Sequence, residues 1–284
     1  GPAADAATAT PAPAARGTGR IAFASYDALR GRDDLYLVDV AQGEARLLQP
    51  NGSQPAFDAG GTRLAFRSLD PQQLGLSILD LRSDSRLETT VHSEDSSPTW
   101  SPDGGQIVFA SNKHGDRKWR LYVISAGEIR GEGQEWILGQ RPAWSADGTR
   151  LAYQGCDERG DRCGVWLMQP GGFRPGPLTT ESSDTAPAWS PDGSQIAFVS
   201  ARSGNWELYL VEIATGAERR LTDDAAADVA PAWSPDGRRL AFLSNRDGAW
   251  AVHILDLRSG QVQKLIAAGD AYPDPLSERL DWIP

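Results

Sequence analysis

The sequence predicts an all-β fold: a six-bladed β-propeller of four-stranded antiparallel blades, with the ring closed by the C-terminal strand. Three observations predict it. A tryptophan followed by a short turn motif recurs about every 44 residues, a strand-like run follows each turn, and two further strand-like runs complete each repeat. Four short strands at this period are typical of propeller blades, whereas helical repeats would show apolar residues about every 3.6 positions.

The recurring turn is Ser-Pro-Asp-Gly. It follows Trp100, Trp189 and Trp233, a variant with alanine follows Trp144, and a degenerate copy, Asp-Ala-Gly-Gly, follows Phe57. Proline presets the second position of a type I turn, aspartate suits the third, and glycine takes the left-handed fourth. We therefore interpret the turns as structural hairpins, and the tryptophans before them as packing residues between blades.

Three more strands follow the tryptophan-bearing strand, which we call strand a. Strand b is predicted at residues 20–25, 63–68, 106–111, 150–155, 195–200 and 239–244. Strand c is predicted at residues 35–39, 76–80, 121–125, 165–169, 208–212 and 252–256. Strand d is weaker, as at residues 218–222 and 262–266.

The two ends of the propeller sequence are complementary: one lacks a strand that the other has in excess. The first repeat lacks a strand a, while the run Arg-Leu-Asp-Trp-Ile at 279–283 has no strand after it. Trp282 follows Trp233 at close to the repeat period. We expect the C-terminal strand to complete the first blade and so remove the open edges of the ring.

The motif Pro-x-Trp-Ser-Pro-Asp-Gly-x-x-[Ile/Leu]-Ala-Phe-x-Ser, followed by a Leu-Tyr strand, resembles the WD-related repeat of TolB-like propellers. The resemblance covers residues 19–284 and lacks the α/β domain that precedes the propeller in TolB. It implies a fold used in periplasmic and surface proteins, in sensor portions of bacterial kinases and in the propellers of some peptidases. A fold shared so widely implies far less about function.

The first 18 residues differ in composition from the rest. Gly1-Pro2 has the form of a remnant of a cleaved expression tag, and the following stretch is mostly Ala, Thr and Pro. A stretch with almost no bulky apolar residue cannot bury surface, so residues 1–18 are expected to be a disordered linker that could tether the propeller, residues 19–284, to a membrane. The sequence contains no run of about 20 apolar residues, the length that a transmembrane helix needs.

The chain is acidic, with 28 Lys and Arg against 38 Asp and Glu and a net charge of -10. This balance argues against nucleic-acid binding, which needs a basic surface. The acidity fits simple solubility, and it also fits a cationic partner or a metal ion.

Two cysteines, Cys156 and Cys163, flank a predicted hairpin loop that contains Gly160. They are too few for a structural zinc site, which takes four ligands. A disulfide is favoured over two free thiols, and it would place the protein in an oxidising, extracytoplasmic compartment.

Acidic and basic side chains recur on the loops expected at one face of the ring. An aspartate precedes the repeat's proline by three residues in three d–a loops, and a cation follows strand b in the b–c loops of the same repeats. These residues are Asp95, Asp184 and Asp228, with Lys113, Arg202 and Arg246. One interpretation is a set of ion pairs that fix the loops; the other is a ring of carboxylates that binds a cation such as Ca²⁺. Because a cation lies near each carboxylate, we expect ion pairs and no metal.

A second set, Trp119, Trp206 and Trp250, lies close to the b–c loops. These side chains either pack inside the blades or form exposed anchors for a partner. Because b–c and d–a loops emerge together, we expect these tryptophans to lie on the same face of the ring as the three aspartates.

Catalysis has little support in the sequence. The three histidines, His92, His114 and His253, are scattered, and no Gly-x-Ser-x-Gly elbow or phosphate-binding glycine motif occurs. We predict a monomeric, non-enzymatic, extracytoplasmic interaction or sensor domain without a cofactor, which binds a protein or peptide on the face of the b–c and d–a loops. The alternative is a propeller that binds a small ligand or carbohydrate in the service of a larger enzyme.

Overall fold

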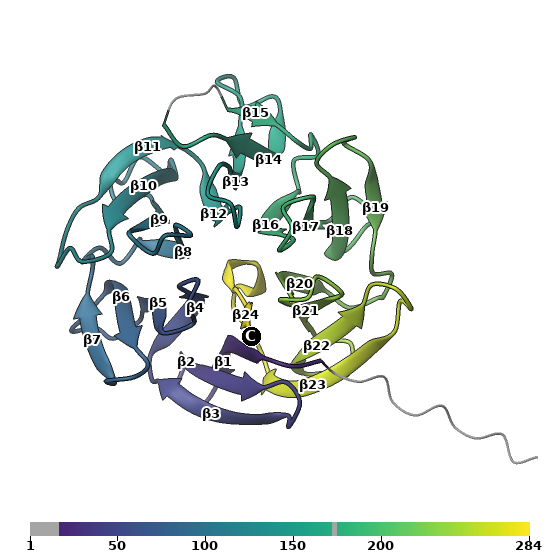
Figure 1. Cartoon of the computed structure of the whole chain (residues 1–284), viewed down its shortest axis with the longest axis horizontal. Coiled ribbons are helices and arrows are strands. Elements are labelled where there is room, and N and C mark those ends of the chain that lie inside the picture. The colour runs from purple at the N-terminus through teal and green to yellow at the C-terminus, as the bar shows by residue number, and fades with distance from the viewer. Residues whose placement is uncertain (1–16, 172–174) are drawn as a thin grey trace, which may run out of the picture.

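The computed structural model describes residues 17–171 and 175–284, so the predicted linker lies almost wholly outside the described residues. The described chain is nearly all β-structure, arranged as blades around a ring with the C-terminus near its centre (Figure 1). The one helix among the described residues is the 3-10 turn η1 (Pro275–Ser277).

Four blades are separate four-stranded antiparallel sheets, each ordered as in the sequence. Their strands are β4 (Gly52–Phe57), β5 (Arg63–Ser68), β6 (Gly75–Asp80) and β7 (Ser85–Glu88); β8 (Ser96–Trp100), β9 (Gln106–Ser111), β10 (Arg120–Ser125) and β11 (Gln134–Leu138); β12 (Gln140–Trp144), β13 (Leu151–Cys156), β14 (Cys163–Met168) and β15 (Gly176–Pro177); and β16 (Thr185–Trp189), β17 (Gln195–Ser200), β18 (Glu207–Glu212) and β19 (Glu218–Arg220).

The remaining strands form one eight-stranded sheet. They are β20 (Asp228–Trp233), β21 (Arg239–Ser244), β22 (Trp250–Asp256) and β23 (Val262–Gly269), then β1 (Arg20–Asp27), β2 (Arg32–Asp39), β3 (Glu44–Gln49) and β24 (Asp281–Ile283). A single parallel bridge, Tyr26 to Gly269, joins the two halves. β24 pairs with β1 in antiparallel register, with Ile21 opposite Trp282.

The innermost strands β4, β8, β12, β16 and β20 each contain one left-handed residue directly before the repeat's proline. These residues are Gln54, Ser97, Arg141, Ala186 and Ala230, all with φ between 48° and 55°. The ladder register shifts at the same place in every one of these strands. The clash of proline with the preceding residue disfavours the right-handed helical region there. The resulting bulges leave carbonyls such as that of Pro98 free to accept a hydrogen bond from a residue outside the ladder.

The tryptophans of the inner strands pack between blades, as predicted. Trp100 Nε1 donates to the Ala56 carbonyl of the preceding blade at 2.9 Å, and Trp233 Nε1 donates to Ala188 at 3.0 Å. Both side chains are buried. Because these two indoles satisfy their one donor across the blade boundary, their apolar bodies can be buried without loss. The buried Nε1 of Trp144 has no hydrogen-bond partner in the described part of the chain.

Candidate functional site

The b–c and d–a loops lie together on one face of the ring. The backbone N–H of Asp228, at the start of β20, donates to the Trp206 carbonyl next to β18 at 2.8 Å. In the same way the N–H of Gly139 donates to the carbonyl of Trp119. These bonds tie the end of one blade's b–c loop to the d–a loop that leads into the next blade.

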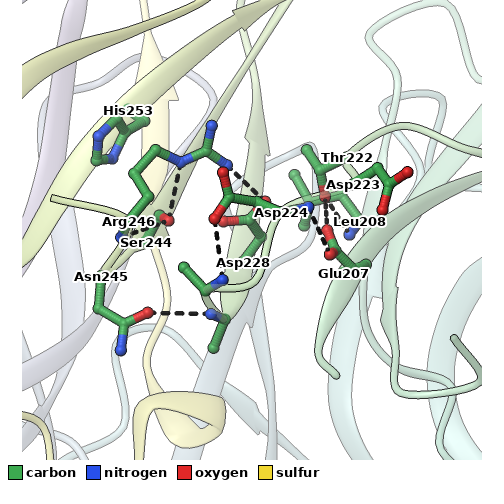
Figure 2. Close-up of polar contacts among 12 residues, drawn as sticks. Glu207, Leu208, Thr222, Asp223, Asp224, Asp228, Ser244, Asn245, Arg246 and His253 are labelled. Carbon is green, nitrogen blue, oxygen red and sulfur yellow. Dashed lines mark hydrogen bonds and ion pairs between the residues drawn. The ribbon is translucent and has the colours of Figure 1, made fainter. Parts of the chain in front are cut away.

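Two of the three aspartates form buried ion pairs. Asp184 is fully buried and accepts both of its contacts from Arg202 Nη2, at 2.8 and 2.6 Å. Asp228, also fully buried, accepts from Arg246 Nη2 at 2.7 Å (Figure 2). Burial raises the pKa of Asp228, and the nearby Ser244 and Arg246 act against that effect. At these two positions the ion-pair interpretation describes the structure.

Asp95 is different, and here the ion-pair expectation is wrong. Lys113 donates to a Glu132 carboxylate oxygen at 3.0 Å and lies 4.3 Å from the Tyr122 ring centroid. Both carboxylate oxygens of the fully buried Asp95 lack a geometrically good hydrogen bond, and burial raises its pKa. Lys113 Nζ donates to both the backbone carbonyl and the carboxylate of Glu132, so its ammonium group is directed away from Asp95.

The alternative interpretation is a ring of carboxylates that binds a cation. Within residues 17–171 and 175–284, no three His, Cys, Asp or Glu side chains gather in a way that could hold a metal ion. The two paired aspartates each face their own arginine instead.

Sequence reasoning missed a buried carboxylate next to this network. Glu207 at the start of β18 is fully buried and accepts from Arg220 Nη2 at 3.0 Å. It also accepts from the Asp224 N–H at 2.9 Å and from the Thr222 hydroxyl (Figure 2). These bonds hold the end of β19 and the β19–β20 connection against β18. No neighbouring repeat carries a glutamate at this position, so the repeat pattern offered no signal for it.

The three tryptophans of the b–c side pack rather than stand free. Trp250 is only 8 % exposed and meets Tyr272 edge to face at 5.6 Å between ring centroids. Trp119 and Trp206 are half-buried against the apolar cores of their blades. Packing, the first of the two interpretations, therefore describes Trp250 fully and the other two in part.

Cys156 and Cys163 form the predicted disulfide. They face each other at the end of the β13–β14 ladder, so the bond closes the b–c loop of that blade. The expected position and partner are both confirmed.

A central cavity was not predicted as a separate site. It has a volume of about 430 Å³ and is bounded by the inner strands of five blades and by the C-terminal segment. At one end lie exposed residues of the a–b turns, Ala59, Ala146, Pro191 and Pro235, together with Pro284. At the other end lie Ser277 and Arg279. The cavity therefore opens on the face opposite the b–c and d–a loops.

The C-terminal segment closes the inner end of this cavity. Arg141 Nε, from β12, donates to the Leu276 carbonyl at 3.2 Å. Arg279 Nη1 donates to the Pro98 and Pro142 carbonyls at 2.9 and 3.3 Å. The sequence predicted a strand at 279–283, whereas β24 begins only at Asp281 and the residues before it cross the ring. They do so because the bulged inner strands offer free carbonyls there.

The blades, the inner-strand tryptophans and the repeated turns together define a β-propeller. A family model described as "TolB beta propeller domain" matches residues 131–279. The chain belongs to this TolB propeller family.

One curated relative is the Protein TolB homolog of Chlorobium luteolum, which is 28% identical over 126 residues. The match covers 43% of this chain and 27% of that protein, so it spans about a quarter of the relative's length.

Solved structures agree on the fold. TolB from Acinetobacter baumannii has a TM-score of 0.78 and 20% identity, covering 94% of this chain and 67% of that one. The putative TolB from Agrobacterium tumefaciens has a TM-score of 0.68 and 20% identity, covering 94% and 100%. An oligogalacturonate lyase in complex with manganese has a TM-score of 0.57 and 17% identity, covering 89% and 75%. The described residues contain no helix long and apolar enough to cross a bilayer.

Proposed function

We propose that this chain is a non-catalytic interaction or sensor domain that binds a protein or peptide on the face of its b–c and d–a loops. In this proposal residues 19–284 act as one monomeric propeller and residues 1–18 as its linker. The disulfide supports an extracytoplasmic location, because such bonds persist in oxidising compartments. The proposal includes no cofactor and no metal.

The observation that carries the proposal is the position of the exposed leucines. Leu29 is 99% exposed in the β1–β2 loop, and Leu74 is 39% exposed in the β5–β6 loop of the next blade. Leu138, 50% exposed, ends β11 at a d–a connection of the blade after that. Single exposed leucines are ordinary, but three on the same face of consecutive blades favour a partner surface.

In this proposal the buried groups predicted as contacts act by holding the loops. Asp184 with Arg202, and Asp228 with Arg246, fix the b–c loops to the d–a loops. Trp119, Trp206 and Trp250 anchor the same loops to the blade cores, with the outer edges of the first two left for a partner.

The test is capture of a partner from an extracytoplasmic extract, followed by binding measurements with the purified partner. We expect the double variant Leu29→Asp, Leu74→Asp to bind at least about 10-fold more weakly than the native protein, because charges would replace apolar contact surface. Leu47→Asp is the matched control, since Leu47 is 49% exposed on β3, away from these loops. Equal affinity of the double variant and the native protein for the partner would show that the partner does not bind on this face.

We also propose that the ring has six blades and that β24 closes it. The single bridge inside the eight-stranded sheet supports its division into two blades. β24 lies beside β1 where the other blades have their tryptophan-bearing strand, and Trp282 donates through Nε1 to the Thr18 carbonyl at 3.0 Å.

The second candidate function is binding of a small ligand or carbohydrate. The cavity of about 430 Å³ favours it, because its volume lies within the range of small-molecule sites. It lies on the opposite face from the leucines, so the two functions are compatible.

A further inference from the structure

Two arginines at the inner end of the central cavity lack an ion-pair partner. Arg141 and Arg279 line the cavity and are half-buried in the middle of the molecule. In the described part of the chain, their hydrogen bonds go to neutral groups only: the carbonyls of Leu276, Pro98 and Pro142 and the side chains of Gln154 and Thr185. Burial lowers the pKa of both guanidinium groups.

The two side chains are held close to the same place by reciprocal bonds. Arg141 reaches the carbonyl of Leu276, three residues before Arg279, while Arg279 reaches the carbonyl of Pro142, the residue after Arg141. Each guanidinium has five N–H groups, and these bonds occupy Nε and Nη1 of Arg141 and Nη1 of Arg279. Donors therefore remain on both side chains for a bound group.

Among the described residues, no carboxylate near the cavity forms an ion pair with Arg141 or Arg279. The Asp58 carboxylate forms an ion pair with Arg63, with Nε 3.0 Å from Oδ2. Burial, with Asp33 acting in the same direction, raises the pKa of Glu278 well above its usual range and so favours its neutral form. The charge of Asp281 raises the pKa of Arg279, against the effect of burial. The Asp281 carboxylate also accepts a hydrogen bond from the Phe57 N–H at 2.6 Å. Asp274, which influences Arg141, is exposed and therefore screened by water and salt.

Two guanidinium groups that form no ion pair among the described residues and keep unused donors suit an anionic ligand. A buried, unpaired guanidinium is unfavourable, and a carboxylate would satisfy both side chains with charge-assisted bonds. The rest of the wall is mainly apolar, with Ala188, Pro187 and Pro231 among its residues. We propose that the central cavity binds the carboxylate of an otherwise apolar ligand, which enters from the a–b turn face and is held by Arg141 and Arg279.

This site is independent of the leucine-bearing face, so each proposal can fail alone. The probes are 3-phenylpropionate and its neutral amide, titrated calorimetrically into the full chain at low and at physiological salt. We expect the acid to bind at least about 10-fold more tightly than the amide. Equal affinities for acid and amide, or no binding of the acid at millimolar concentration, would overturn the proposal.

A peptide pair distinguishes the source of the carboxylate. Acetyl-Ala-Pro-Phe with a free C-terminus is compared with the same peptide amidated. Tighter binding of the free peptide than of 3-phenylpropionate indicates a peptide terminus as the ligand, and weaker binding indicates a small free acid. Both outcomes support a carboxylate site.

Variants locate the site. Arg141→Gln and Arg279→Gln should each abolish the preference for acid over amide. Arg162→Gln makes the same charge change on the opposite face, where Arg162 pairs with Asp157, and should leave the preference unchanged. If Arg279→Gln does not fold, Arg141→Gln and the acid–amide comparison on the native protein still decide the question. A preference retained in Arg141→Gln would count against the assignment.

Discussion

Asp95, Asp184 and Asp228 occupy the same position in three repeats, but their surroundings differ. Arg202 and Arg246 meet the second and third, whereas Lys113 is drawn to Glu132, to which His92 also bonds at 2.8 Å. All three aspartates of the repeat pattern are fully buried in the structure. The repeat pattern could not predict that Lys113 pairs with Glu132, because Glu132 lies in the β10–β11 connection, outside the repeated motif.

Amide substitution should therefore have opposite effects at two of these sites. Asp184→Asn leaves Arg202 Nη2 without its buried carboxylate partner and should destabilise the protein by about 1–3 kcal/mol. Asp95→Asn removes a charge that is buried without a cation, so it should stabilise the protein. Thermal unfolding of both variants at pH 7 measures the difference.

The pH dependence of Asp95→Asn has a defined sign. Burial raises the pKa of Asp95 in the folded state above its ordinary value of 3.8, so the folded protein binds the proton more tightly than the unfolded chain. Ionisation of Asp95 therefore lowers the free energy of unfolding at a pH above 3.8, and this destabilisation disappears at a pH below 3.8. The gain in melting temperature of Asp95→Asn should shrink as the pH falls towards 3.8. A gain that stays constant over this range would contradict the assignment.

Among the elements, the disulfide loop of the β13–β14 blade was the most predictable, and the C-terminal crossing was the least. The two cysteines Cys156 and Cys163 predict a closed loop from their own spacing, independently of the other repeats. The crossing depends on carbonyls that the left-handed inner residues make available, and a repeat pattern does not reveal that backbone geometry. Arg141 stands where other repeats have Gln, Ser or Ala, which was the one available signal for a cavity site.

Reduction of the disulfide should open its loop before the ring unfolds. The bond closes a short exposed loop that contains Arg159 and Arg162, both trypsin sites. A loop of this length corresponds to about 2–3 kcal/mol in the chain-entropy account, too little to unfold a domain of this size by itself. We expect Cys156→Ser, Cys163→Ser to be cut first after these arginines under native conditions.

Cleavage in the β9–β10 loop, at Arg117 or Lys118, serves as the internal control and should be equally fast with and without the disulfide. If cleavage becomes faster in both loops when the disulfide is absent, the disulfide stabilises the whole ring rather than its own loop.

At the scale of the molecule, the repeat predicted the blade plan because each blade is an independent copy of the same pattern. The turns, the strand order and the packing tryptophans all follow from residues visible in one repeat. The function of the faces does not, since Leu29, Leu74, Arg141 and Arg279 lie at positions where the repeats differ. These departures from the pattern carry both proposals.

Ring closure is the property that only the whole molecule possesses, and deletion of Asp281–Pro284 tests it. The deletion removes the three-residue ladder with β1, the bond from the Phe57 N–H to Asp281, and the buried side chains of Trp282 and Ile283. Loss of a buried tryptophan alone costs about 3–5 kcal/mol, against a total stability of about 5–15 kcal/mol for a typical domain. We therefore expect the melting temperature to fall by about 10 °C or more, as measured by calorimetry. Deletion of the exposed Pro284 alone is the control and should change little. A truncated protein that melts within about 2 °C of the native one would show that β24 does not close the ring, because the free edge of β1 would then carry no penalty.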